Sequence, residues 1–179
     1  MNYLRKDNMK YKLYKALWMI VWTVFIRPFP RATISYFEII ILRLFGAKIG
    51  KRCDIYSSAK ILVPYNLSIG DNVTLADRIL IQNTTLVQIG SNSIISQGTY
   101  LCAGSHDIYK ETFDTIRKPI IIGEKVWIAA ECFVGPGVII GDGSVAGARS
   151  CIFKNVAPWT VVGGNPAKYI KDRKINVEG

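Results

Sequence analysis

The stretch IGDNVTLADRILIQNTTLVQIGSNSIISQGTYLC, residues 69–102, decides the fold, because an aliphatic residue recurs at intervals of six within each of two successive runs. The recurring residues are Ile69, Leu75 and Ile81, followed by Ile89, Ile95 and Leu101. A period of six fits neither an α-helix, with about 3.6 residues per turn, nor an alternating strand, with a period of two. It fits a short strand followed by a turn. Three such units make one triangular coil whose recurring aliphatic residues point inward.

The same pattern extends from Ile49 to Ile152. An Ile-Gly pair opens each unit, and the pairs are Ile49-Gly50, Ile69-Gly70, Ile89-Gly90, Ile122-Gly123 and Ile140-Gly141. Glycine suits the tight corner after a strand because it has no Cβ to clash. The interval from residue 89 to residue 122 is 33, against 18 for one coil, so we expect an inserted loop at about 104–118. Insertions in a repeat tend to build its binding face.

From residue 46 to about residue 173 the sequence resembles the hexapeptide-repeat acyltransferases. The resemblance implies a mainly β protein, a left-handed parallel β-helix of about five coils with N-terminal α-helices and a short C-terminal helix. The handedness comes from the family, since the period does not determine it. We expect three regions: an N-terminal basic and aromatic helical arm and cap at 1–48, the β-helix at 49–162, and a C-terminal loop and short helix at 163–179.

Two helices are expected ahead of the β-helix. The first covers Leu13–Ile26 and is ended by Pro28 and Pro30. The second begins at Ser35, whose spacing to Glu38 is that of a capping box, and ends at Gly46.

Positive charge is concentrated near the N-terminus. The net charge is +10, and residues 1–52 hold eleven Lys or Arg against two acids, whereas residues 53–179 hold twelve against eleven. Such asymmetry suggests an acidic partner, either phospholipid or nucleic acid. Nucleic acid is disfavoured because large apolar residues, rather than polar ones, separate these charges.

The first expected helix has two interpretations. One face carries Leu13, Leu17, Ile20, Val21 and Val24, and Trp18, Trp22 and Phe25 widen it. Its uncharged part, residues 16–26, has eleven residues, whereas a membrane span needs about 20. The helix either packs on the prism or a neighbouring subunit, or it lies in a membrane interface. In the second case residues 10–31 place tryptophan at headgroup depth and put Lys10, Lys12, Lys15, Arg27 and Arg31 on anionic lipid.

The cysteines and the single histidine give no sign of a metal site. Cys53, Cys102, Cys132 and Cys151 are scattered and form no Cys-x-x-Cys pair, so we expect small buried thiols and no metal. The sequence has no secretory pattern with a cleavage site. We therefore expect a cytoplasmic protein, with peripheral attachment to the inner face of the membrane left open.

His106 is the only histidine, and it stands at the mouth of the expected loop. Histidine changes its charge near neutral pH, so it is a natural general base toward an alcohol or amine. Acyl transfer from a thioester needs such a base, a donor near the developing oxyanion, and a dry slot that aligns both substrates. The alternative is an ordinary loop histidine that makes a structural hydrogen bond.

The run Gly104-Ser105-His106-Asp107, followed after the loop by Val126-Trp127-Ile128, resembles the sugar O-acetyltransferases. It is most similar to their colanic-acid and exopolysaccharide biosynthesis branch, and PWTVVGGNPAK at residues 158–168 matches that branch too. Asn165 and Pro166 within this run are expected to begin a short basic helix at 168–174. The resemblance implies a homotrimer with acetyl-CoA bound between neighbouring prisms, where the His106 loop of one subunit meets the next.

The resemblance also assigns roles to further residues. It puts Asn83 and Trp127 near the acceptor sugar, although a corner role for Asn83 and plain packing for Trp127 remain open. Asp107 either fixes the tautomer of His106 as part of the catalytic group or caps the loop. For CoA, the small residues Ala129, Gly147 and Ala148 would admit the pantetheine arm, and Lys154, Lys168 and Lys171 would reach the phosphates. Related enzymes often carry Arg in place of Lys168 and Lys171, and lysine lacks the bidentate fork.

Together these features predict an acetyl-CoA-dependent O-acetyltransferase that acts on a sugar hydroxyl in surface polysaccharide biosynthesis, by direct transfer with His106 as general base. The alternative is a non-catalytic β-helical scaffold docked to a membrane by its N-terminal arm, which would not need His106. Two other enzyme classes that contain a similar β-helix are excluded. Zinc carbonic anhydrases need three histidine ligands, and sugar nucleotidyltransferases need a nucleotide-binding domain with a Gly-rich phosphate loop.

Overall fold

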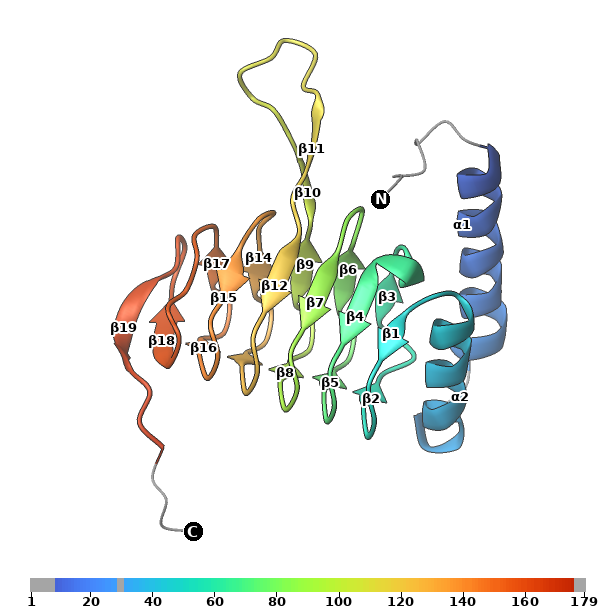
Figure 1. Ribbon diagram of the computed structural model, residues 1–179, viewed down its shortest axis with the longest axis horizontal. Helices are drawn as coiled ribbons and strands as arrows, with labels where there is room; N and C mark the ends of the chain where they lie inside the picture. The colour runs from blue at the N-terminus through green and yellow to red at the C-terminus, as the bar shows by residue number, and fades with distance from the viewer. Residues whose placement is uncertain (1–8, 29–30, 176–179) are drawn as a thin grey trace.

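The structure is a computed structural model that describes residues 9–28 and 31–175, with side chains for 9–28 and 36–175. Three parallel sheets form the sides of a triangular prism that runs from two helices at one end to the C-terminal strands at the other (Figure 1). This architecture confirms the predicted mainly β, parallel β-helical fold.

Each sheet takes one strand from every coil. Sheet A contains β1 (Lys48–Ile49), β4 (Leu67–Ile69), β7 (Val87–Ile89), β12 (Ile120–Ile122) and β15 (Ile139–Ile140). Sheet B contains β2 (Asp54–Ile55), β5 (Thr74–Leu75), β8 (Ile94–Ile95), β13 (Trp127–Ile128), β16 (Val145–Ala146) and β18 (Thr160–Gly163). Sheet C contains β3 (Lys60–Ile61), β6 (Leu80–Gln82), β9 (Tyr100–Cys102), β14 (Phe133–Val134) and β17 (Cys151–Ile152). Five coils are complete, and β18 begins a sixth.

The recurring aliphatic residues stack in register. In sheet B, Ile55 pairs with Leu75, Leu75 with Ile95, and Ile95 with Ile128. All four side chains are fully buried. Each rests on the equivalent residue of the next coil, so one continuous hydrophobic core runs along the prism. The predicted inward positions are confirmed.

The glycine of each Ile-Gly pair is required by the neighbouring coil. A Cβ added to Gly90 would lie 2.5 Å from the carbonyl carbon of Gly123, closer than any real contact allows. The left-handed backbone at this corner belongs to the residue two positions later, with φ of 55° at Asn72 and 60° at Asn92. Asparagine tolerates that conformation, and the Nδ2 of Asn72 donates to the Oδ1 of Asn92 at 2.9 Å. At each corner, therefore, the glycine avoids a clash with the next coil, and the residue two positions later adopts the left-handed backbone of the turn.

The residues in excess of 18 per coil fall on one edge of the prism, between sheets C and A. The first coil has the 3-10 helix η2 (Pro64–Asn66) at this edge, and the second coil has the turn that contains Asn83. The third has a hairpin of β10 (Gly104–His106) and β11 (Thr115–Arg117), which are antiparallel. The hairpin projects well beyond the prism (Figure 1).

The N-terminal helices close the first coil. They are α1 (Met9–Val21), which continues into the π-helix η1 (Trp22–Ile26), and α2 (Arg31–Leu44). Trp18 and Trp22 are buried, and their Nε1 atoms donate to the carbonyls of Ile61 at 2.6 Å and Ala59 at 3.0 Å. The prediction that these tryptophans lie at lipid headgroup depth is therefore wrong, because their indoles cap the prism. No helix in the described residues is long and apolar enough to cross a membrane.

Two helix starts differ from the sequence prediction. The first helix begins at Met9, before Leu13, because the amphipathic pattern continues through the lysines of that turn. The second begins at Arg31, so Ser35 lies inside the helix and the predicted capping box is wrong. The predicted stop at Gly46 is confirmed, since α2 ends at Leu44 and Gly46 has a left-handed φ of 88°. Pro30 lies outside the described residues.

The predicted C-terminal helix is wrong. Residues 168–172 form the strand β19 (Lys168–Asp172), which pairs antiparallel with β18, and Asn165 and Pro166 lie in the preceding turn. So short a segment has little helical stability alone, whereas β18 offers backbone groups that would otherwise form a free edge of sheet B. Arg173 locks the strand in place by donating from Nη1 to the carbonyls of Lys125 and Gly143, both at 2.8 Å.

We expect Gly90→Ala to lower the melting temperature by about 2–12 °C, because overpacking costs about 1–3 kcal/mol and each kcal/mol corresponds to about 2–4 °C at this size. Gly147→Ala is the matched control, since a Cβ there would meet its nearest atom at an ordinary 3.5 Å. Thermal melts followed by circular dichroism measure both. Equal melting temperatures for the two variants would contradict the steric explanation of the Ile-Gly repeat.

Candidate active site

The hairpin at the edge between sheets C and A holds the single histidine. His106 is the last residue of β10 and pairs with Thr115 of β11. The base of the hairpin packs tightly on the coil before it, because a Cβ on the buried Gly104 would lie 2.9 Å from the Oγ1 of Thr84. The histidine thus sits on paired strands anchored to the prism.

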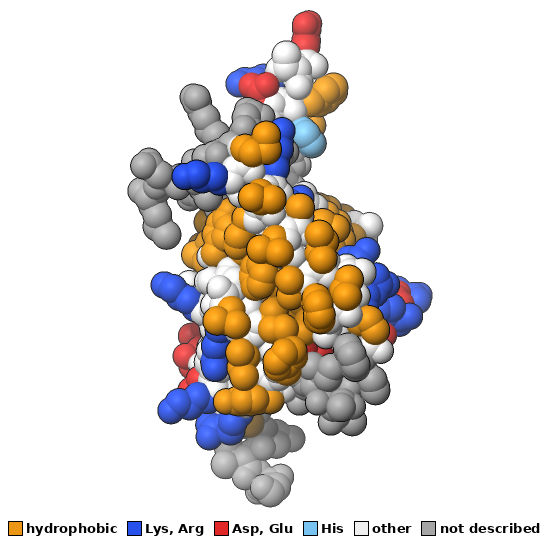
Figure 2. All heavy atoms as spheres, turned by 90° about the vertical axis from the view of Figure 1, so that its right-hand side faces the viewer, with side chains coloured by type: hydrophobic (Ala, Val, Ile, Leu, Met, Phe, Trp, Pro, Cys, Tyr) orange, Lys and Arg blue, Asp and Glu red, His pale blue; other side chains and the backbone are white. Residues whose placement is uncertain are grey.

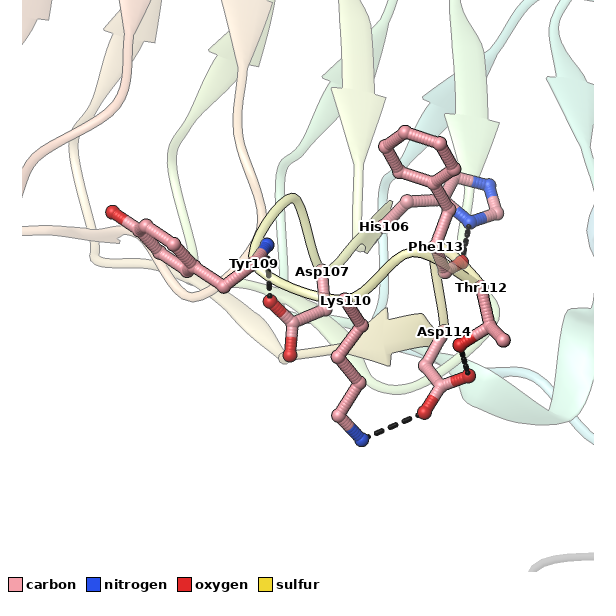
Figure 3. Close-up of polar contacts among 7 residues, drawn as sticks. All are labelled: His106, Asp107, Tyr109, Lys110, Thr112, Phe113 and Asp114. Carbon is pink, nitrogen blue, oxygen red and sulfur yellow. Dashed lines mark hydrogen bonds and ion pairs between the residues drawn. The ribbon is translucent and has the colours of Figure 1, made fainter.

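The ring of His106 has a defined orientation. Its Nδ1 lies 2.6 Å from the carbonyl oxygen of Phe113, across the hairpin (Figure 3). A carbonyl can only accept a hydrogen bond, so Nδ1 carries the proton in the neutral ring and Nε2 carries the lone pair. The side chain is exposed, which leaves Nε2 open to a molecule outside the chain. This is the arrangement that a general base requires.

The loop of the hairpin is held by its own polar contacts. Asp107 accepts at Oδ1 from the backbone N–H of Tyr109 at 3.1 Å, and its own N–H donates to the carbonyl of Asp114 at 2.8 Å. Lys110 forms an ion pair with Asp114 at 2.7 Å. The hydrogen bond from Lys110, followed by one from Thr112, lowers the pKa of Asp114, so this tie is present at neutral pH and weakens as pH falls through that lowered pKa.

Asp107 does not fix the tautomer of His106, contrary to one of the two predicted roles. Its carboxylate points toward the N–H of Tyr109, away from the imidazole (Figure 3). The carbonyl of Phe113 takes that role instead. Neighbouring side chains on a strand point to opposite faces, and for this reason His106 and Asp107 diverge. The loop-capping interpretation fits what Asp107 does.

Asn83 has a structural role in this chain. It is fully buried, its Oδ1 accepts from the N–H of Val63 at 2.9 Å, and its Nδ2 donates to the carbonyl of Val63 at 2.7 Å. Its backbone carbonyl accepts a further bond from Asn66. Both polar atoms of the amide bond to Val63, and none of the contacts of Asn83 supports the predicted role at the acceptor sugar. The corner interpretation is the one the contacts support.

Trp127 lies on a different side of the prism from His106. It belongs to β13 in sheet B, between Ile94 and Val145 in register, and its side chain is 48% exposed. Its Nε1 donates to the Oγ of Ser96 at 3.0 Å. Figure 1 shows the neighbouring strands β8 and β16 on the lower side of the prism and the hairpin on the upper side. One chain alone therefore does not bring the two residues together.

The residues predicted for CoA fall into three places. Ala129 and Gly147 occupy equivalent positions on successive coils, where sheet B turns into sheet C, and the N–H of Ala129 donates to Ala146. Ala148 next to them is exposed. Lys154 follows β17 on the edge toward sheet A. Lys168 and Lys171 are exposed on β19, beside sheet B.

Gly147 differs from the glycines of the Ile-Gly repeat. Its φ is outside the left-handed region, and a Cβ would have 3.5 Å to the nearest atom, the carbonyl oxygen of Val162. Nothing in the described part of the chain requires glycine at this position. Because neither the backbone nor the packing of this chain requires glycine at residue 147, its presence at the surface is consistent with close approach by another molecule.

An aromatic row that the sequence pattern did not predict lies on the outer face of sheet C. Tyr100 and Phe133 meet edge to face with ring centroids 5.4 Å apart, and Phe133 and Phe153 are 5.5 Å apart. Burial raises the pKa of Tyr100 to about 12, and its hydroxyl contacts Gln82. A signal for this row exists in the sequence, because Tyr100 and Phe133 each directly precede an inward aliphatic residue. The row leads into β10 and so supports the hairpin.

Comparison with known proteins gives clear relatives, although no protein-family model matches the chain. Over 133 residues it is 48% identical to a protein of Escherichia coli strain K12 named as a colanic acid biosynthesis acetyltransferase, WcaF. The matched residues make up 74% of this chain and 73% of that relative. It is 34% identical over 114 residues to the galactoside O-acetyltransferase of the same strain, over 60% of this chain and 54% of that protein. In fold it resembles a hexapeptide-repeat acetyltransferase of Vibrio cholerae solved with acetyl coenzyme A, with a TM-score of 0.83 and 22% identity over 94% of this chain and 92% of that one.

We expect Asn83→Ala to destabilise the protein by about 2–6 kcal/mol, because it leaves the buried N–H and carbonyl of Val63 without partners, at about 1–3 kcal/mol each. Asn155→Ala is the matched control, since Asn155 makes a similar bond to the N–H of Ile139 but is exposed. Urea unfolding compares the two. If Asn83→Ala were as stable as the control, the structural role of Asn83 would be contradicted and a ligand-binding role would be favoured.

Proposed function

The chain belongs to the hexapeptide-repeat acetyltransferases and is an acyltransferase, and from this premise we propose that it acetylates a sugar hydroxyl with acetyl-CoA during surface polysaccharide biosynthesis. The acetyl donor is supported by the acetyl-CoA complex of the Vibrio cholerae protein of the same fold. A sugar acceptor is supported by the names of two relatives, one for colanic acid biosynthesis and one for galactoside O-acetylation. A non-catalytic scaffold is set aside because the named relatives are enzymes.

The observation that carries this proposal is the geometry of His106. With the proton on Nδ1 directed to the Phe113 carbonyl, Nε2 presents a lone pair to the solvent side of the hairpin. That nitrogen accepts the proton of a sugar hydroxyl as the oxygen attacks the thioester. The imidazolium that forms is stabilised by the same carbonyl, which accepts its Nδ1–H throughout.

The reaction we propose is a direct transfer. The sugar oxygen forms a bond to the thioester carbon while Nε2 of His106 takes its proton, and the tetrahedral intermediate then expels the CoA sulfur. The proton returns from Nε2 to that sulfur, so the products are the acetyl ester and CoA thiol. No acyl-enzyme is needed. The thiols support this, since Cys102 and Cys132 are buried and burial raises the pKa of Cys132, which disfavours its nucleophilic thiolate.

The active site in this proposal is composite, built from two chains of a homotrimer. Its support is the separation of the residues within one chain, with His106 on the edge between sheets C and A and Trp127 on sheet B. A second prism that places its sheet B beside this hairpin would bring the two kinds of residue together. The exposed Trp127 would then line the acceptor side, since sugars stack well on aromatic rings.

The surface around Gly147 fits the pantetheine arm of acetyl-CoA. Gly147 and the exposed Ala148 present backbone with little side chain, at a corner where the chain itself makes no demand for glycine. Exposed lysines, Lys154, Lys168 and Lys171, would supply charge to the phosphates. Because lysine is a point charge without the fork of arginine, we expect this contact to depend on charge more than on geometry.

The first test removes the base. His106→Ala should lower acceptor-dependent CoA release from acetyl-CoA by about 10²–10⁴-fold, measured over a panel of sugars and glycolipids. Asp107→Asn is the matched control, because asparagine keeps the Oδ1 that caps the loop, and we expect its rate within about threefold of wild type. Equal release by wild type and His106→Ala would mean that the histidine is structural and the site lies elsewhere.

The second test concerns the donor. Gly147→Ala should raise the KM for acetyl-CoA by about 5–100-fold with little change in the acceptor KM, because a methyl group intrudes on the pantetheine path at a cost of about 1–3 kcal/mol. The melting temperature of this variant reports whether the fold is intact. An unchanged KM for acetyl-CoA in a folded variant would move the donor site away from this corner.

A further inference from the structure

The helical end of the prism presents a hydrophobic surface that no described part of the chain covers. We call it the outer helical surface and define it by Met9, Leu13, Leu17, Met19, Ile20, Val24, Phe25, Tyr36, Phe37 and Leu44. Each of these side chains is more than half exposed. Figure 2 shows hydrophobic side chains gathered over the centre of this end and Lys and Arg side chains around its margin. An apolar patch of this kind marks an interaction site.

The first helix has two apolar faces. Trp18 and Trp22 are turned to the prism and bond to its first coil. The opposite face carries the exposed row Leu13, Leu17, Ile20 and Val24, spaced four, three and four residues apart through α1 and η1. Capping the prism requires only the first face. The second face is therefore unexplained by the fold.

The exposed charges on residues 9–28 and 36–48, which carry this surface, have one sign. Lys10, Lys12 and Arg27 are exposed on the same segment, and residues 9–28 contain no Asp or Glu. Glu38 is the one acid in 36–48, and it is fully buried. An apolar surface bordered by cations, without exposed acids in these segments, is complementary to a surface that is apolar inside and anionic outside.

We propose that the outer helical surface docks on an anionic lipid bilayer, with α1 and η1 lying in the plane of the interface. The aliphatic row enters the boundary between headgroups and acyl chains, while the lysines and Arg27 contact lipid phosphates. A second copy of this surface is disfavoured, because a symmetric contact would set cations against cations. The proposal does not depend on the acetyl transfer, since binding to lipid is measured without substrate.

The experiment is vesicle co-sedimentation of the full chain. Wild type should bind vesicles of phosphatidylcholine with about 30% phosphatidylglycerol, and bind pure phosphatidylcholine much more weakly. Leu13→Gln with Ile20→Gln should weaken binding by at least about tenfold through the apolar term. Lys10→Gln with Lys12→Gln should weaken it by about 10–30-fold, since each lysine contributes about fivefold.

Matched controls make the same changes elsewhere. Ile170→Gln with Ile175→Gln removes two exposed isoleucines at the other end of the chain, and Lys125→Gln with Lys174→Gln removes two exposed lysines. Both pairs should bind as wild type does. Equal binding by the helical variants and their controls, or no binding by wild type, would overturn the proposal. So would a smaller assembly of Leu13→Gln with Ile20→Gln in sedimentation equilibrium without lipid, which would make this surface a contact between copies.

Discussion

The structure depends on the close stacking of one coil on the next. Successive strands of each sheet are a single strand spacing apart, about 4.8 Å, so every residue lies directly over its equivalent in the coil before. At the corner after sheet A this leaves no room for a Cβ, as the 2.5 Å approach at Gly90 illustrates. The same constraint puts aliphatic residues inside in unbroken columns. It also means that any residue in excess of the repeat must leave the prism sideways.

The hairpin is the largest insertion into the repeat, and its base packs on the coil before it. Asn83 fixes the corner of the second coil through Val63, and Gly104 then packs on Thr84 of that same corner. The antiparallel pairing of β10 and β11 extends from Gly104 to His106, which pairs with Thr115. The carbonyl of Phe113, in the loop before the returning strand, accepts from Nδ1 and so orients the imidazole. Structural residues thus position the imidazole of His106.

The two ends of the prism solve the same edge problem in different ways. At the C-terminal end β19 covers β18, and Arg173 secures it to two backbone carbonyls. At the N-terminal end the indoles of Trp18 and Trp22 satisfy carbonyls of the first coil. A strand needs only its backbone to close an edge, whereas a helix does so with one face of side chains. Only the helical solution leaves a second face whose composition is free, and here that face is aliphatic.

The sequence by itself determined the coil, its inward residues and the place of the insertion, because the six-residue period is a local signal that recurs in every coil. It could not decide roles set by partners distant along the chain. Asn83 was suited both to acceptor binding and to a corner role, and its bonds to Val63, 20 residues earlier, support the corner role. Asp107 was suited either to fixing the tautomer of His106 or to capping the loop, and its bond from the N–H of Tyr109 supports the cap. The segment 168–172 carried a helix signal that the open edge of β18 overrode. Tertiary structure likewise decided which face of the first helix packs inward. Both faces are apolar, but only the prism offers carbonyls to the indole N–H groups.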